Sequence, residues 1–124
     1  EYIASAPNTF TIEFWAYPTA SRTVTAESNS GSSGTSGQRY AIGPAWGGST
    51  GAGTGISVGT NGISVFEHGD NYMPSLLVHN ATLSGWNHIV VAYENKQPKL
   101  YLNGQFIKTG LASQRTNVVH TRSL

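Results

Sequence analysis

The densest group of chemically capable side chains lies in the run "EHGDNY", residues 67–72. Glu67, Asp70 and Asn71 carry side-chain oxygens, and His68 and Tyr72 add polar groups beside them. A hard cation such as Ca²⁺ takes roughly six to eight oxygen ligands, several of them usually carboxylates. These three side chains, together with backbone carbonyls, could supply part of such a shell.

The same run also fits a simple reversal of the chain, because Gly-Asp-Asn is a common turn composition. The spacing is not that of an EF-hand, and Asp70 is the only aspartate in the protein. We therefore expect a turn at Asp70 and Asn71. Calcium held by Asp70, Glu67 and Asn71 is the alternative.

A second candidate is Trp46, the one large side chain in the glycine-rich stretch "GPAWGGSTGAGTG", residues 43–55. The glycines do not follow G-x-G-x-x-G and no helical pattern comes after them, which excludes a phosphate-binding loop. Trp46 either plugs the space beneath its loop or faces a ligand. In the second case we expect a binding site that Trp46 shares with His68, Asp70, Asn71 and Tyr72, since loops carry most binding residues.

Catalysis has little support in the side chains that are present. Glycoside hydrolysis needs two carboxylates flanking the scissile bond, whereas the acids of this chain are scattered singly. No serine lies in a nucleophile elbow, and the absence of cysteine excludes thiol chemistry. We expect a protein that is not an enzyme.

Length and composition indicate one domain, residues 1–124, with a single core. Only 10% of the residues are charged while 15 are glycine, so solubility depends on Ser, Thr, Asn and backbone. That composition is typical of an extracellular or particle-surface protein. No apolar run is long enough for a membrane helix, so no membrane span is expected.

The charges are unevenly distributed along the chain. Residues 1–94 contain two arginines and six acids, whereas residues 96–124 contain five basic residues and no acid. Five separated charges make a weak phosphate-binding pattern, so no nucleic-acid partner is expected. Instead, we expect the basic third to fold across an acidic surface.

Alternation of apolar and polar residues predicts strands throughout, and no segment has helical periodicity. The clearest strand is residues 86–94, which is apolar on both faces and therefore an interior strand. Asn103-Gly104 predicts a type I′ turn between residues 99–102 and 105–108. In residues 10–18 the second face carries Trp15 and Tyr17, which we expect a loop or sheet to cover rather than sugars to stack upon. The predicted core residues are Phe10, Ile12, Phe14, Ile89 and Val91.

Several of these strands occur in a recognisable order. "FTIEFWAYP", "QRYAIG", "GISVGTNGISVFEH" and "GWNHIVVAYE" followed by "KLYLNG" together resemble the laminin-G-like branch of the concanavalin A-like lectin/glucanase superfamily, over residues 2–112. The resemblance implies an all-β, antiparallel β-sandwich of the jelly-roll type. It also implies a secreted protein that binds glycans or protein surfaces, in some cases with calcium.

The resemblance further implies a closing strand beside the N-terminal one, for which residues 113–124 offer only Val118-Val119. We expect the chain to be a fragment or one piece of a larger protein, and another subunit to fill the gap by strand complementation. The leading hypothesis is a non-catalytic binding module. The alternative is a structural subunit of a filament, capsid or tail, and a glycoside hydrolase fragment comes third.

Overall fold

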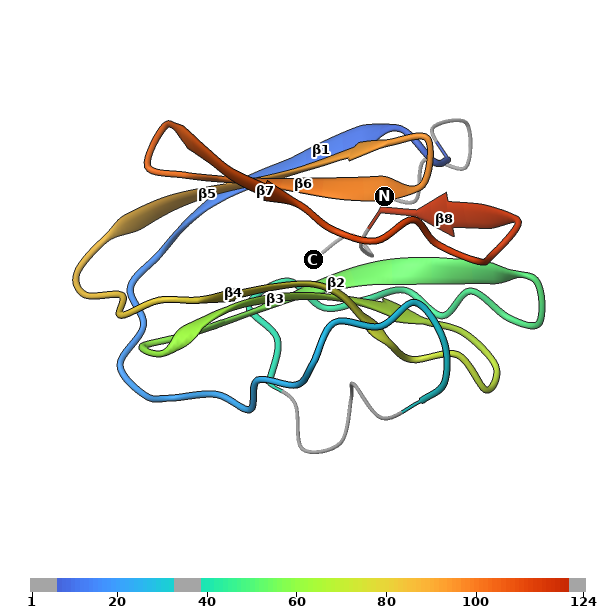
Figure 1. The fold of residues 1–124 in the computed structure, drawn as a ribbon, viewed down its shortest axis with the longest axis horizontal. Coiled ribbons are helices and arrows are strands. Elements are labelled where there is room, and N and C mark those ends of the chain that lie inside the picture. Colours follow the sequence, from blue (N-terminus) through green and yellow to red (C-terminus); the bar gives the residue numbers. More distant parts are fainter. Residues whose placement is uncertain (1–6, 33–38, 121–124) are drawn as a thin grey trace.

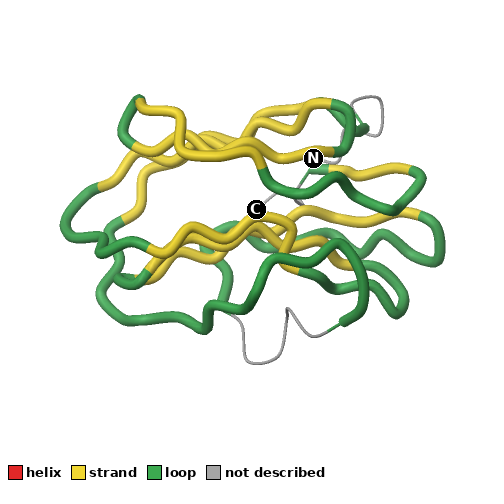
Figure 2. The backbone as a smooth tube through the Cα atoms, viewed as in Figure 1, coloured by secondary structure: helices red, strands yellow, loops and turns green. Residues whose placement is uncertain are grey.

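The computed structural model describes residues 7–32 and 39–120. This part of the chain contains eight strands and no helix, and the strands stack as two layers (Figure 1; Figure 2). The expected all-β sandwich is therefore confirmed. The strands are β1 (Phe10–Ala16), β2 (Gly51–Gly59), β3 (Gly62–His68), β4 (Ser75–Asn80), β5 (Asn87–Glu94), β6 (Gln97–Leu102), β7 (Gln105–Thr109) and β8 (Asn117–Val119).

The first sheet has the order β1-β5-β6-β7, and every pair in it is antiparallel. β5 lies between β1 and β6, so the prediction of an interior strand is confirmed. Its alternation places Ile89, Val91 and Tyr93 in the core, all three at most 2% exposed. Apolar side chains on the inward face of a central strand are what fix its register, because a shift by one residue would turn them outward.

The turn between β6 and β7 has the predicted geometry. Asn103 and Gly104 both have positive φ, 52° and 81° respectively, and Leu102 pairs directly with Gln105. A type I′ turn needs this conformation at both central residues, and Asn and Gly adopt it more readily than other residues.

Replacing Gly104 by Ala should lower the free energy of unfolding by about 1 kcal/mol, because a Cβ is disfavoured at positive φ. Urea unfolding measures the change. Gly43→Ala is the matched control, since Gly43 has no positive φ and open space where a Cβ would lie. Equal effects of the two substitutions would show that turn strain is not the cause.

The second sheet has the order β4-β3-β2-β8, with β8 parallel to β2. Val118 of β8 is completely buried, so the Val118-Val119 pair does contribute a strand to the core, contrary to expectation. This strand lies beside β2 and not beside β1. Among the described residues, β1 pairs with β5 alone and forms one edge of the first sheet.

The core lies between the two sheets and includes residues from both. Ile56, Ile63, Val65 and Leu77 meet Ile89, Val91 and Leu100 there. Of the five predicted core residues, Ile89 and Val91 are fully buried, while Phe10, Ile12 and Phe14 are partly buried and pack against the cluster. The edge position of β1 explains this difference, because no described strand covers its outer side.

The outer faces of the two sheets differ in their covering. The described part of the segment between β1 and β2, here called the covering segment, runs along the outside of the second sheet (Figure 1), where Phe66 and Leu76 are fully buried. No described segment covers the outside of the first sheet, and Trp15 there is 63% exposed. The expectation that Trp15 and Tyr17 are covered is therefore wrong, because the covering segment lies on the opposite layer.

Two further features concern the segments outside the sandwich. Residues 33–38 lie outside the described residues, whereas the side chain of Asn29 donates a hydrogen bond from Nδ2 to the carbonyl of Ala112 (3.0 Å). Within residues 7–32 and 39–120, no helix is long and apolar enough to cross a membrane.

Candidate ligand-binding site around Trp46

The glycine-rich stretch before β2 positions Trp46 by unusually close backbone packing. A Cβ on Gly53 would lie 1.9 Å from the carbonyl oxygen of Ala45, and one on Gly47 would lie 2.2 Å from Cα of Ala52. Only glycine allows backbones to approach this closely. The chain on both sides of Trp46 is therefore held directly against β2.

Backbone hydrogen bonds join this stretch to the chain that follows β3. The amide of Gly47 donates to the carbonyl of His68 (3.0 Å), and the amide of Asp70 donates to the carbonyl of Gly48 (2.8 Å). The two candidate segments of the sequence are therefore neighbours in space, as the binding hypothesis required.

The Asp70-Asn71 segment is a turn. Gly69 and Tyr72 exchange backbone hydrogen bonds (2.7 and 3.1 Å), and Asn71 has a φ of 53°. Asn adopts this left-handed conformation more readily than most residues. The prediction of a turn at Asp70 and Asn71 is confirmed.

Trp46 is fixed in place and exposed at the same time. Its indole Nε1–H donates to Oδ1 of Asp70 at 2.7 Å, while 58% of the residue remains accessible. The imidazole of His68 contacts the indole edge-on, with 6.3 Å between ring centroids. Trp46 is therefore not a plug beneath its loop but an indole held at the surface in one orientation.

His68 lies behind Trp46 and connects it to the covering segment. His68 Nε2 shares a hydrogen bond of 2.6 Å with the hydroxyl of Tyr40. Burial lowers the pKa of His68 and raises the pKa of Tyr40 to about 12, because both charged forms lose hydration. At neutral pH the pair is uncharged, and its role at the site is to support Trp46.

A pocket of about 220 Å³ opens beside the indole. Besides Trp46 it is lined by Thr50 and Asn117, which bring a hydroxyl and an amide, and by Val119. Asn117 and Val119 belong to β8, far from Trp46 in the sequence. No local pattern points to Asn117 as a site residue, because only the parallel pairing of β8 with β2 brings it here.

Glu67 and Tyr72 lie away from this surface. Glu67 shares the inward face of β3 with Val65, and its carboxylate accepts hydrogen bonds from the hydroxyls of Tyr93 (2.8 Å), Ser113 (2.6 Å) and Tyr72 (3.2 Å). Glu67 is 0% and Tyr72 5% exposed. Burial raises the pKa of Glu67 to about 7, although these hydrogen bonds and the charge of Lys96 oppose the shift.

This geometry corrects two of the predicted assignments. Tyr72 is not at a ligand-facing position, because its hydroxyl points to Glu67 and the Arg115 guanidinium covers its ring at 4.6 Å. Glu67 cannot share a surface cation with Asp70, because its oxygens already serve three buried hydroxyls.

Asp70 and Asn71 remain at the exposed turn, where Arg115 also donates to the backbone carbonyl of Asp70. In the part of the chain that the structure describes, no three His, Asp or Glu side chains gather closely enough to hold a metal ion. Calcium at this turn stays a prediction.

Three of the basic residues after position 95 have partners within the chain. Lys99 pairs with Glu94 (2.9 Å) and Lys108 pairs with Glu27 (2.5 Å), while Nζ of Lys96 donates to the carbonyl of Arg115 (2.9 Å). The expectation that the basic third folds across acidic groups agrees with these contacts.

Two packed sheets, in which all strand pairs but one are antiparallel, define the protein as a β-sandwich domain. A family model described as the concanavalin A-like lectin/glucanases superfamily matches residues 3–124. The chain belongs to that superfamily, as the resemblance of its strands indicated. Its laminin-G-like domains often bind carbohydrate or protein and are generally non-catalytic, although the superfamily includes glycosidases. Searches of curated proteins and of solved structures gave no match.

Proposed function

We propose that this protein is a non-catalytic glycan-recognition domain whose primary site is the pocket beside Trp46. The observation that carries the proposal is the exposed indole, which Asp70 holds in one orientation at 2.7 Å. A planar apolar ring beside a small pocket with a few polar groups has the character of a small-ligand site.

The chemistry of the lining favours a neutral sugar. The apolar C–H face of a pyranose can stack on the indole, while the Thr50 hydroxyl and the Asn117 amide can exchange hydrogen bonds with sugar hydroxyls. The one acid at the site, Asp70, already accepts from the indole. Because the ring is held before binding, little side-chain freedom is lost when the ligand arrives.

The distribution of acids supports recognition without catalysis. Glu13 pairs with His88 on the open face of the first sheet (2.8 Å), and Glu67 is sequestered in the core. Neither carboxylate lines the Trp46 pocket, so a pair flanking a bound glycosidic bond is not available there. An extracellular or particle-surface location is part of this proposal and follows from the low charge content.

Trp46→Ala is expected to weaken binding of a neutral oligosaccharide by roughly 30-fold, or about 2 kcal/mol, the size typical of a central tryptophan in a binding site. The ligand is first selected on a glycan array with the wild-type domain. Affinity is then measured by isothermal titration calorimetry.

The matched control is Phe106→Ala, which removes an exposed aromatic ring from β7 on the other sheet. The control should keep wild-type affinity. Asp70→Ala should give an intermediate loss, because the indole stays but is no longer fixed. Binding that survives Trp46→Ala unchanged would refute the site, and turnover of any polysaccharide would refute the non-catalytic assignment.

A structural subunit is the second candidate function, and the edge position of β1 favours it. Among the described residues no strand pairs with the outer side of β1, and an open edge is a template for a strand from another chain. Sedimentation of the isolated domain distinguishes the candidates. A concentration-dependent oligomer supports the subunit, and a cooperatively folding monomer supports the recognition domain.

A further inference from the structure

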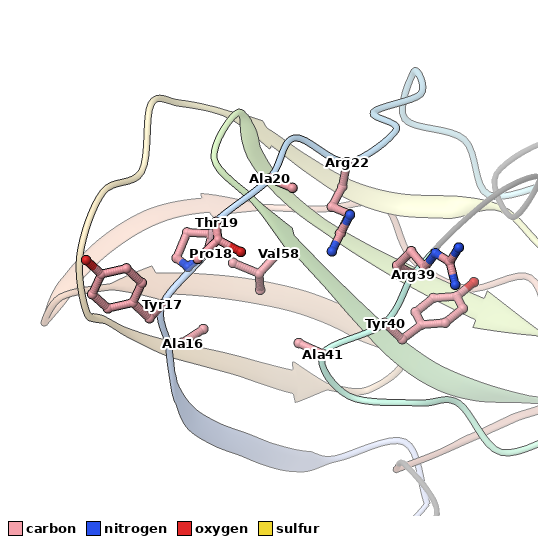
Figure 3. A pocket seen from close by; sticks show the side chains of 10 residues that line it. All are labelled: Ala16, Tyr17, Pro18, Thr19, Ala20, Arg22, Arg39, Tyr40, Ala41 and Val58. Atoms are coloured by element: carbon pink, nitrogen blue, oxygen red, sulfur yellow. The ribbon is translucent and has the colours of Figure 1, made fainter.

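A second pocket, of about 200 Å³, lies at the opposite end of β2 from Trp46. It is bounded by the chain that follows β1, which brings Tyr17, Thr19 and Arg22, by Arg39 and Tyr40 of the covering segment, and by Val58 of β2 (Figure 3). Sites that enclose drug-sized ligands hold roughly 300–1,000 Å³. This pocket therefore suits a single sugar-sized group.

The positive charge at this pocket has no acidic counterpart among the described residues that line it. Arg22 and Arg39 are the only lysine or arginine residues in residues 1–94, and both line the pocket, whereas no acid does. The acids of the described chain are engaged elsewhere: Glu13 with His88, Glu27 with Lys108, Glu94 with Lys99, Asp70 with Trp46 and Glu67 with buried hydroxyls. The two lining arginines therefore give this pocket a net positive charge that no lining acid balances.

The backbone at Arg22 is fixed, while its side chain extends into the pocket. The amide of Arg22 donates to Oδ1 of Asn61 (2.9 Å), and its carbonyl accepts from Nδ2 of the same residue (2.8 Å). The Arg22 side chain extends into the space between the two segments, whereas Arg39 lies at the opposite rim with its guanidinium turned toward the Tyr40 hydroxyl (Figure 3). The hydrogen bond between Tyr40 and His68 holds that rim as well.

Two exposed aromatic rings lie at the end of the pocket opposite Arg39 and Tyr40 (Figure 3). Tyr17 is 55% exposed and meets Trp86, itself 66% exposed, edge-to-face at 5.6 Å. An arginine recognises a carboxylate or sulfate through several directed N–H groups, and an aromatic ring offers an apolar face to the adjoining sugar.

We propose that the Arg22–Arg39 pocket binds an acidic sugar residue, with the neighbouring sugar of the same glycan over Tyr17 and Trp86. The shared chemistry is a single anionic group on a pyranose, either a carboxylate or a sulfate ester. This site is separate from the Trp46 pocket and does not depend on it. A domain with both sites recognises a glycan of mixed neutral and acidic residues.

The test titrates the intact domain with three tetrasaccharides, namely tetragalacturonate, its methyl ester and a sulfated κ-carrageenan tetramer. The methyl ester has the same skeleton without the charge. We expect at least one acidic tetramer to bind about tenfold more tightly than the ester, and the one that does identifies the anion. No preference for either acidic tetramer over the ester overturns the proposal.

The variants Arg22→Ala and Arg39→Ala should each remove most of that preference, and Arg22→Lys should retain only part of it because the directed guanidinium contacts are lost. Lys99→Ala removes the same charge from β6 and should leave the preference unchanged. Trp46→Ala is measured beside it to show at which of the two sites the acidic tetramer binds. Melting temperatures verify that each variant is folded. An equal loss in Lys99→Ala would show a general charge effect, and a loss in Trp46→Ala alone would place the acidic ligand at the first site; either result overturns the proposal.

Discussion

The Val91→Asp variant is expected to be unfolded at neutral pH. Val91 is 0% exposed in the centre of β5, where it pairs with Ile12 of β1 and Leu100 of β6. No basic side chain belongs to the buried cluster around it, so the new carboxylate would be unpaired. An unpaired buried charge costs several kcal/mol, of the same order as the roughly 5–15 kcal/mol that stabilises a typical domain.

Circular dichroism and urea unfolding check this result against Val90→Asp. Val90 is the next residue of the same strand and points to the open outer face, where it is half-buried between Glu13 and Tyr101. The free energy of unfolding of the control should fall by only about 1 kcal/mol, which is the full range of intrinsic strand propensities among residue types. Equal stability of the two variants would mean that β5 does not have the described register.

Glu67→Gln is expected to change the pH dependence of stability. Burial raises the pKa of Glu67 from 4.5 to about 7 in the folded protein. The folded state therefore retains a proton that the unfolded chain releases, and the stability linked to it is complete below pH 4.5 and lost as the pH rises through 7. At about 1.4 kcal/mol per pKa unit, the loss is about 3 kcal/mol.

Glutamine keeps the shape and stays neutral, so the variant does not incur this loss. Between pH 4 and pH 8, the difference in unfolding free energy between Glu67→Gln and wild type should move by about 3 kcal/mol in favour of the variant. Burial lowers the pKa of His68 and of His79, which acts in the opposite direction, but both histidines are present in each protein and cancel in the difference.

Urea titrations at several pH values provide the measurement. Tyr72, Tyr93 and Ser113 keep a hydrogen-bonding partner in the glutamine variant, because hydroxyls can turn to accept as well as donate. Glu67→Leu is the complementary change. It leaves three buried hydroxyls without that partner and should be less stable than Glu67→Gln at every pH. A pH-independent difference between Glu67→Gln and wild type would show that Glu67 titrates normally.

The sequence by itself determined most of the strands and part of the core. Alternation in residues 86–94 placed Ile89 and Val91 inward, and Asn103-Gly104 defined its turn, because both depend on interactions between residues close in the chain. Alternation in residues 63–67 also predicts that Glu67 points inward, because it shares a face with Ile63 and Val65. The oxygen-bearing side chains of Asp70 and Asn71 beside it instead suggested a calcium site that would include Glu67.

Only the tertiary structure decided which faces are open and which residues meet. The covering segment lies on the second sheet, so Trp15 is exposed while Phe66 is buried. Trp46 gains Asn117 through the pairing of β8 with β2, and Arg22 reaches the same pocket as Arg39 although 17 positions separate them. Such contacts depend on how the layers pack and join residues that are far apart in the sequence. Local periodicity predicts strands and their faces but not these long-range contacts.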